Sequence, residues 1–322
     1  MRNRQRWITL GKALATVVVL GLVLRKVPLA ELATRMRALS FRDLALLLVL
    51  TILQVTVGVV RWQRLLRRVS ERVAFLPLYG DVLVGLTYNM FLPTTVGGDV
   101  VRALRCRTRV VHGHAAWSTS LFERIAGLLA MAASGAIAAG VGLGSDASIP
   151  SSIRVLAAGL ALALLGAFFF AATPFRLLVG QLERRLPSVA DDVRGIAADL
   201  GGPLATHSAR IEALGWSLLY QALGVVFVVV GANALGAPGH TLAIVVGVPI
   251  VHVLSMVPVT IGGLGLREGL FVAILGPLGV PPVVALGLAA QWLASSVGFA
   301  VAGAVVALGG ARHPAEKISP GA

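Results

Sequence analysis

Hydrophobic runs fill most of this chain, and short basic blocks separate them. The runs lie at residues 13–24, 44–60, 73–101, 115–143, 153–172, 211–235, 242–280 and 283–308. Most of them are long enough to cross a bilayer as helices, which takes roughly 17–25 residues. The pattern therefore predicts an all-α integral membrane protein, a polytopic helical bundle of about six to eight spans.

Composition and charge indicate the same class. The 322 residues are 57% hydrophobic and 13% charged, with a mean hydropathy of +0.87, which excludes an ordinary soluble protein. The net charge of +14 lies mainly in blocks such as Arg61, Arg64, Arg67, Arg68 and Arg72. Such blocks mark cytoplasmic loops that face anionic lipids, so no nucleic-acid partner is predicted. We expect a multi-pass protein of the cytoplasmic (inner) membrane with both termini in the cytoplasm.

The remaining polar segments predict one membrane domain over residues 1–322. Residues 1–24 have the outline of a signal peptide, but no small-residue cleavage site follows, so they are predicted to form an uncleaved first span. Residues 25–42 have apolar positions at helical spacing and are predicted to lie along the interface. Residues 174–210 form a cytoplasmic amphipathic segment too short for a soluble catalytic domain.

One motif occurs twice, as MFLPTTVGGDVVR at 90–102 and as SMVPVTIGGLGLRE at 255–268. Each copy has a proline, a threonine two residues later, a β-branched residue, a glycine pair and then an arginine. Proline and paired glycines interrupt helices. In a bilayer, interrupted backbone is tolerated only where it is buried in protein or lines a polar cavity. We therefore predict two pseudo-related broken or re-entrant segments, 78–102 and 242–268.

The basic blocks predict how these two segments enter the membrane. Blocks at 61–72 and 102–109 flank the first segment, so it should dip in from the cytoplasm and return. The second segment should enter from outside, which is the arrangement of an inverted repeat. Its length leaves open whether 242–280 forms two short spans or a re-entrant pair.

The motif residue types point to an anion. A break at the glycine pair would expose backbone amides beside a helix N-terminus, and the arginine would add a planar charged fork. The predicted ligand is phosphate-like. The alternative is that the glycines only permit close helix packing. The motif residues predicted to bind it are Pro93, Gly97, Gly98, Asp99, Arg102, Pro258, Gly262, Gly263, Gly265, Arg267 and Glu268.

Ionised side chains within apolar runs are costly and mark a pathway or a paired site. Besides the charged motif residues, Glu123 and Arg124 fall in such a run. We expect Glu123 to pair with Arg102 or Arg124. Arg267 is expected to pair with Glu268 or Asp99. The alternative is that these pairs only hold the bundle together.

Three other polar positions are further candidates. Asn89 lies one turn before the first motif proline and could line the cavity or bridge helices. His252 could carry a proton, although a lone histidine in an apolar run is usually a packing residue. The Asp191-Asp192 pair could hold a divalent cation, but a solvated surface pair is the simpler interpretation. No catalytic residue, metal ligand or cofactor is predicted.

The segments NMFLPTTVGGDVVR at 89–102, FERIAG at 122–127 and VPVTIGGLGLREG at 257–269 resemble the lysylphosphatidylglycerol synthase transmembrane family of flippase-like proteins. The resemblance covers essentially the whole chain. It implies a polytopic helical bundle associated with moving aminoacylated phospholipid between leaflets. It also implies that the motif residues, with Glu123 and Arg124, line the headgroup path. Because the last predicted span ends near Leu308, we expect this chain to lack the aminoacyl-transferase domain of the full synthases.

The resulting expectation is a lipid transporter or flippase, not an enzyme, that binds the phosphate of an anionic or aminoacylated phospholipid or of a polyprenyl phosphate. One alternative is a membrane glycosyltransferase or other transferase acting on a polyprenyl-phosphate lipid, with Asp99 or Asp191-Asp192 as its acidic site. Another is a non-catalytic membrane partner of a separate lipid synthase.

Overall fold

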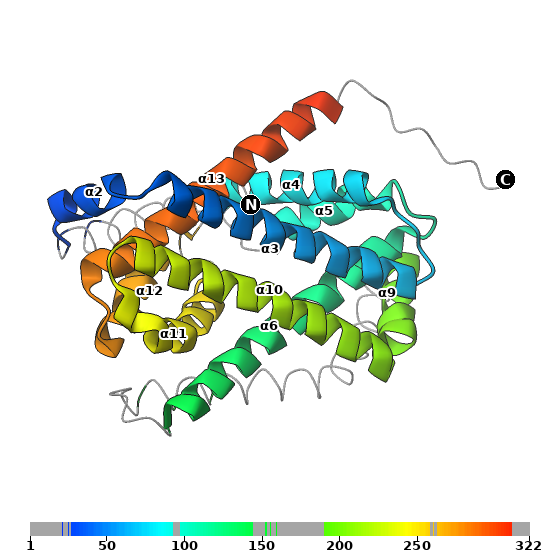
Figure 1. The fold of residues 1–322 in the computed structure, drawn as a ribbon. Helices are drawn as coiled ribbons and strands as arrows, with labels where there is room; N and C mark the ends of the chain where they lie inside the picture. The colour runs from blue at the N-terminus through cyan, green and yellow to red at the C-terminus, as the bar shows by residue number, and fades with distance from the viewer. Residues whose placement is uncertain are drawn as a thin grey trace, which may run out of the picture.

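A computed structural model describes residues 27–92, 97–143, 190–257 and 263–310, with the isolated positions 21, 25, 152, 155, 159 and 260. All the regular structure in these residues is helical, which confirms the predicted all-α class (Figure 1). The α-helices are α2 (Leu29–Arg37), α3 (Phe41–Arg68), α4 (Phe75–Phe91), α5 (Gly97–Arg107), α6 (Gly113–Leu143), α9 (Ala190–Gly201), α10 (His207–Ala234), α11 (Thr241–Leu254), α12 (Leu266–Leu275) and α13 (Pro282–Gly310). Short 3-10 turns lie at Pro203–Ala205, Pro238–His240 and Gly276–Leu278.

Three helices of the described chain are long and apolar enough to cross a membrane: Phe41–Arg68, His207–Ala234 and Pro282–Gly309. The first begins at a capping box, in which Ser40 Oγ accepts a hydrogen bond from the Asp43 amide at 3.2 Å. α3 and α13 also expose rows of large apolar side chains, as expected of surfaces that face lipid. These include Leu44, Leu48, Leu53, Val301, Val305 and Leu308.

The described chain has three hydrophobic clusters, and two of them lie beside the two copies of the motif. The larger one joins α10, α11, α12 and α13 around fully buried Phe271 and Leu275. The other joins α3, α4, α5 and α6 around Trp62 and Leu78, which have no exposed surface. Each copy of the motif therefore lies beside a different cluster, and α13 connects the two parts by packing against both α4 and α12.

The first predicted broken segment consists of α4 and α5, which form an antiparallel hairpin. Near the start of α4, Asp81 contacts Arg105 and Arg109 at 2.8 and 3.0 Å, while further along α4 the Gly85 backbone lies against Gly98. A hairpin of this kind returns the chain to the side from which it started. Residues 93–96, including Pro93, lie outside the described residues.

The second predicted broken segment consists of α11 and α12, which are 14 and 10 residues long. At 1.5 Å per residue, each is shorter than the hydrocarbon layer of about 30 Å. Gly263 and Gly265 take φ values of +75° and +80°, a region that glycine adopts without a Cβ clash. Pro258 and Gly262 lie outside the described residues. Both motif copies thus follow the C-terminal end of one short helix and lead into another.

Two segments at the edge of the bundle were also predicted from the sequence. Within residues 25–42, α2 packs Leu32 and Met36 against the larger cluster, whereas Leu29 is 49% exposed. The described part of 174–210 contains α9, which packs against α6. Its earlier residues lie outside the described residues, and its cytoplasmic, amphipathic character remains a prediction.

Candidate functional site

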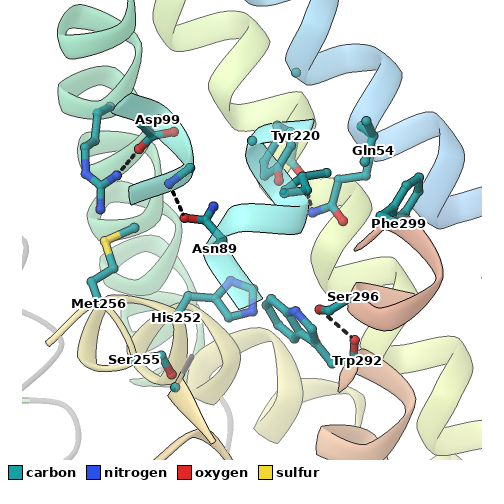
Figure 2. A pocket seen from close by; sticks show the side chains of 18 of the residues that line it. Gln54, Asn89, Asp99, Tyr220, His252, Ser255, Met256, Trp292, Ser296 and Phe299 are labelled. Carbon is teal, nitrogen blue, oxygen red and sulfur yellow. Dashed lines mark hydrogen bonds and ion pairs between the residues drawn. The ribbon is translucent and has the colours of Figure 1, made fainter. Parts of the chain in front are cut away.

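A cavity of about 440 Å³ lies between the two broken segments. The close-up in Figure 2 shows Asp99 and Asn89 on one side, His252 and Trp292 on another, and Tyr220 and Gln54 opposite. Long helices α3, α6, α10 and α13 complete the walls. The structure brings eight of the predicted site residues to this lining: Asn89, Gly98, Asp99, Arg102, Glu123, Arg124, Gly263 and Arg267.

Glu123 is the most buried charge in the cavity wall, with 3% of its surface exposed. One of its carboxylate oxygens accepts from Arg61, and the other lies 2.9 Å from Arg102 Nη2. The predicted pair between Glu123 and Arg102 is present. Each oxygen of this carboxylate therefore lies in an ion pair with a different arginine.

Asp99 extends the same network along the cavity. Its Oδ1 lies 3.1 Å from Arg102 Nε, and its Oδ2 accepts from Arg124. Arg124 therefore pairs with Asp99. The order of charges across the wall is Arg61, Glu123, Arg102, Asp99, Arg124. Because the signs alternate, the attraction between neighbours offsets part of the desolvation cost of burying each charge.

Neutral groups fix the arginines of this network in place. Arg61 Nη1 donates to Ser217 Oγ at 3.0 Å and its guanidinium lies over the Tyr220 ring, 5.2 Å from the centroid. Arg102 Nη2 donates to Ser120 Oγ at 3.2 Å and lies over Trp62 at 4.6 Å. These contacts orient the planar forks and satisfy donors that the carboxylates do not reach.

Arg267 occupies a different environment on the far side of the cavity. Its guanidinium lies over the Trp292 ring at 5.4 Å, and it forms no ion pair with any carboxylate of the described chain. The predicted pairs of Arg267 with Glu268 or Asp99 are therefore wrong. Glu268 instead accepts from the Gly265 amide at 2.6 Å and caps the N-terminus of α12.

Five buried polar atoms of the lining residues lack hydrogen-bond partners. Two of them, Arg102 Nε and Glu123 Oε2, lie within ion pairs, and the other three lie outside any ion pair of the described chain. These three are His252 Nε2, Gln221 Nε2 and Thr260 Oγ1, in residues that are 8%, 2% and 3% exposed. His252 also contacts Trp292 edge to face, with 4.2 Å between ring centroids. Buried groups without partners are expensive, so the cavity has unmet capacity for a polar ligand.

Several predicted residues fall elsewhere. Gly97, Gly265 and Glu268 are buried beside the cavity and are absent from its lining, whereas Pro93, Pro258 and Gly262 lie outside the described residues. Asn89 reaches the lining and also accepts from the Gly98 amide at 2.7 Å, which ties the end of α4 to the start of α5 (Figure 2).

Sequence reasoning missed Arg61, Tyr220, Gln221, Ser217 and Trp292. Arg61 was assigned to a cytoplasmic basic block, but it is 8% exposed and faces Glu123. Helical spacing could have revealed Arg61. Because α3 continues through the basic block, Arg61 lies on the same face of the helix as Gly58 and Gln54, which also line the cavity. The polar residues of α10 and α13 lie in apolar runs and had no motif to mark them.

The fold and the cavity define a class: α-helical membrane proteins in which two interrupted helix pairs close a charged internal site. This chain belongs to the family described as the lysylphosphatidylglycerol synthase TM region, whose model matches residues 8–309. The match confirms the resemblance seen in the motifs and relates the chain to membrane lipid synthesis and flipping. No curated protein and no solved structure matches the chain.

Proposed function

We propose that this protein is a membrane lipid transporter that binds a phosphate-bearing headgroup in the cavity. The observation that carries the proposal is the charge of the lining: four arginines face two carboxylates, a formal excess of two positive charges within the membrane domain. Uncompensated cations at such a position favour an anionic ligand that completes the balance.

The shape of the site suits a lipid. The cavity wall also contains apolar residues such as Leu86, Met131, Leu293 and Phe299, and α3 and α13 expose apolar surface outside. A headgroup could therefore occupy the charged interior while its acyl or prenyl tails stay in the bilayer. A switch between inward and outward access requires different contacts in each state, and the two glycine-containing breaks are the candidate hinges.

The acidic residues that a transferase would use for catalysis are in ion pairs with arginines. Asp99 is held between Arg102 and Arg124, Asp191 contacts Arg194 at 3.1 Å, and Asp192 contacts Arg107 at 2.9 Å. These carboxylates act as ion-pair partners in the described chain. No observation among the described residues favours the transferase alternative over the transporter, and a separate synthase stays a proposed partner.

Lipid movement in reconstituted proteoliposomes tests the proposal. Vesicles containing phosphatidylglycerol or undecaprenyl phosphate, with and without the protein, would be assayed for exchange between leaflets. Periodate added outside cleaves the diol of outer-leaflet phosphatidylglycerol and so reports its movement. Faster exchange of at least one of these lipids is expected. Exchange no faster than in protein-free vesicles for both lipids would overturn the transporter proposal.

A further inference from the structure

We infer that the cavity selects anionic headgroups made of phosphate and neutral hydroxyl groups, and that it rejects headgroups that carry an amine. The inference rests on the proposed binding of a lipid phosphate and narrows its substrate class. It distinguishes phosphatidylglycerol, which has a phosphate and a glycerol diol, from its lysyl ester, which adds two ammonium groups.

The carboxylates that could bind an ammonium group are already in ion pairs with arginines. Glu123 contacts Arg61 and Arg102 through its two oxygens, and Asp99 contacts Arg102 and Arg124 through its own. They are the two carboxylates in the cavity lining of the described chain. An ammonium would have to displace a guanidinium that is held by at least one further contact. It would also enter a wall that already has an excess of positive charge.

The aromatic rings that could bind a cation are largely occupied too. Arg61 lies over Tyr220 and Arg267 lies over Trp292, at 5.2 and 5.4 Å from the ring centroids. The lining of the described chain has two further rings, the imidazole of His252, whose ring lies edge to face with that of Trp292, and the phenyl ring of Phe299. Recognition of ammonium groups by aromatic residues uses a cage of several rings, and one phenylalanine and one histidine do not provide it.

The groups that remain available match phosphate and hydroxyl oxygens. Arg267 has five donor hydrogens and no carboxylate partner in the described chain. His252 Nε2, Thr260 Oγ1 and Gln221 Nε2 are buried and lack hydrogen-bond partners. A guanidinium suits a phosphate oxygen pair, and neutral amide, imidazole and hydroxyl groups suit a polyol. The chemistry of these groups therefore favours a negatively charged, hydroxyl-bearing headgroup.

Lipid-induced stabilisation of the purified full chain in detergent gives the first test. The thermal midpoint would be measured at increasing concentrations of phosphatidylglycerol, its lysyl ester and phosphatidylethanolamine. We expect phosphatidylglycerol to bind at least about tenfold more tightly than either amine-bearing lipid, equivalent to about 1.4 kcal/mol. Equal or tighter binding of the lysyl ester would overturn the inference, as would the absence of stabilisation by all three lipids.

Two variants sharpen the same test. Arg124→Gln releases Asp99 Oδ2 from its arginine and should raise the relative affinity for the lysyl ester several-fold. Arg64→Gln is the matched control, because Arg64 is half exposed and lies 3.9 Å from Glu212, away from the cavity. The control should keep the wild-type preference. An Arg124→Gln protein that binds lipid with unchanged selectivity would contradict the role given to the paired carboxylates.

Leaflet exchange separates this inference from the transporter proposal. In proteoliposomes, periodate reports phosphatidylglycerol, and a membrane-impermeant amine reagent reports the lysyl ester. Selective binding of phosphatidylglycerol without exchange of any lipid would leave the headgroup inference standing and overturn transport. Exchange of the lysyl ester at a rate equal to or above that of phosphatidylglycerol would support transport and overturn the inference.

Discussion

Arg102 and Arg267 occupy the same position in the two copies of the motif, yet their surroundings differ. Arg102 contacts Asp99, Glu123 and Ser120 and lies over Trp62. Arg267 lies over Trp292 and has no carboxylate partner in the described chain. In the alignment of the copies, Asp99 corresponds to Leu264, so the second copy lacks the acid that neutralises the first arginine.

The difference assigns separate roles to the two halves of the cavity. In the first copy, the charges pair with one another and join α3, α5 and α6. In the second copy, the acid that follows the arginine, Glu268, is used to cap α12, and the arginine is left facing the cavity. The first half is thus a structural charge network, and the second half is the candidate phosphate contact.

The largest effect is expected from Glu123→Gln, which leaves Arg61 and Arg102 without their shared carboxylate. Breaking a buried pair by removing one partner costs about 3–5 kcal/mol, so the free energy of unfolding should fall by that amount. Denaturant unfolding of the detergent-purified protein would measure it. Glu212→Gln is the control, because this partly exposed partner of Arg68 should contribute about 1 kcal/mol or less. Equal losses in the two variants would contradict a structural network.

A smaller loss is expected from Gly98→Ala, which tests the close approach within the first hairpin. An added Cβ would meet the Gly85 carbonyl oxygen and lie 2.5 Å from Asn89 Cγ, and overpacking of this kind costs about 1–3 kcal/mol. Gly263→Ala should cost about 1–2 kcal/mol for a different reason, its φ of +75°. Gly215→Ala in α10 has open space around it and should not destabilise. A Gly215→Ala protein that loses as much unfolding free energy as either of the other two variants would refute the steric constraints assigned to the breaks.

The smallest effect is expected from Glu268, whose role is that of a helix cap. Glu268→Ala removes the acceptor for the Gly265 amide and should lower the free energy of unfolding by about 1 kcal/mol. Glu268→Gln keeps an oxygen acceptor, so it should retain most of the stability. The same unfolding titration would measure Glu268→Gln. A loss of several kcal/mol in this variant would show that the charge of Glu268 has a partner. Glu268 would then resemble the ion-paired Glu123 and would not act only as a helix cap.

Some of this arrangement could be read from the sequence, because it depends on local patterns. Hydrophobic runs predicted the all-α class, and proline with paired glycines predicted breaks that the structure shows after Phe91 and Leu254. Of the two partners predicted for Glu123, Arg102 and Arg124, the structure shows Arg102 at 2.9 Å. Local patterns were sufficient wherever the determining contacts involve neighbouring residues or a marked repeat.

The remainder depends on tertiary contacts that leave no local pattern. Arg61 reaches Glu123 across 62 positions of the chain, and its place in a basic block favoured a surface position. Trp292 and His252 lie in featureless apolar runs, and the packing of α12 against both α11 and α13 brings their rings into contact. The sequence also could not show that Arg267 lacks a carboxylate partner in the described chain. Glu268 is adjacent in sequence, but its carboxylate is turned toward the α12 N-terminus.

The central claim is that Arg267 contacts the lipid whereas Arg102 holds the protein together, and one paired measurement tests it. Arg267→Gln and Arg102→Gln would be compared for unfolding free energy and for phosphatidylglycerol exchange in proteoliposomes. Arg267→Gln should slow exchange by about tenfold or more, the loss of one charged hydrogen bond, while stability changes by less than about 1 kcal/mol. Arg102→Gln should instead lower stability by about 3 kcal/mol or more. Undiminished exchange in a folded Arg267→Gln protein would contradict the account.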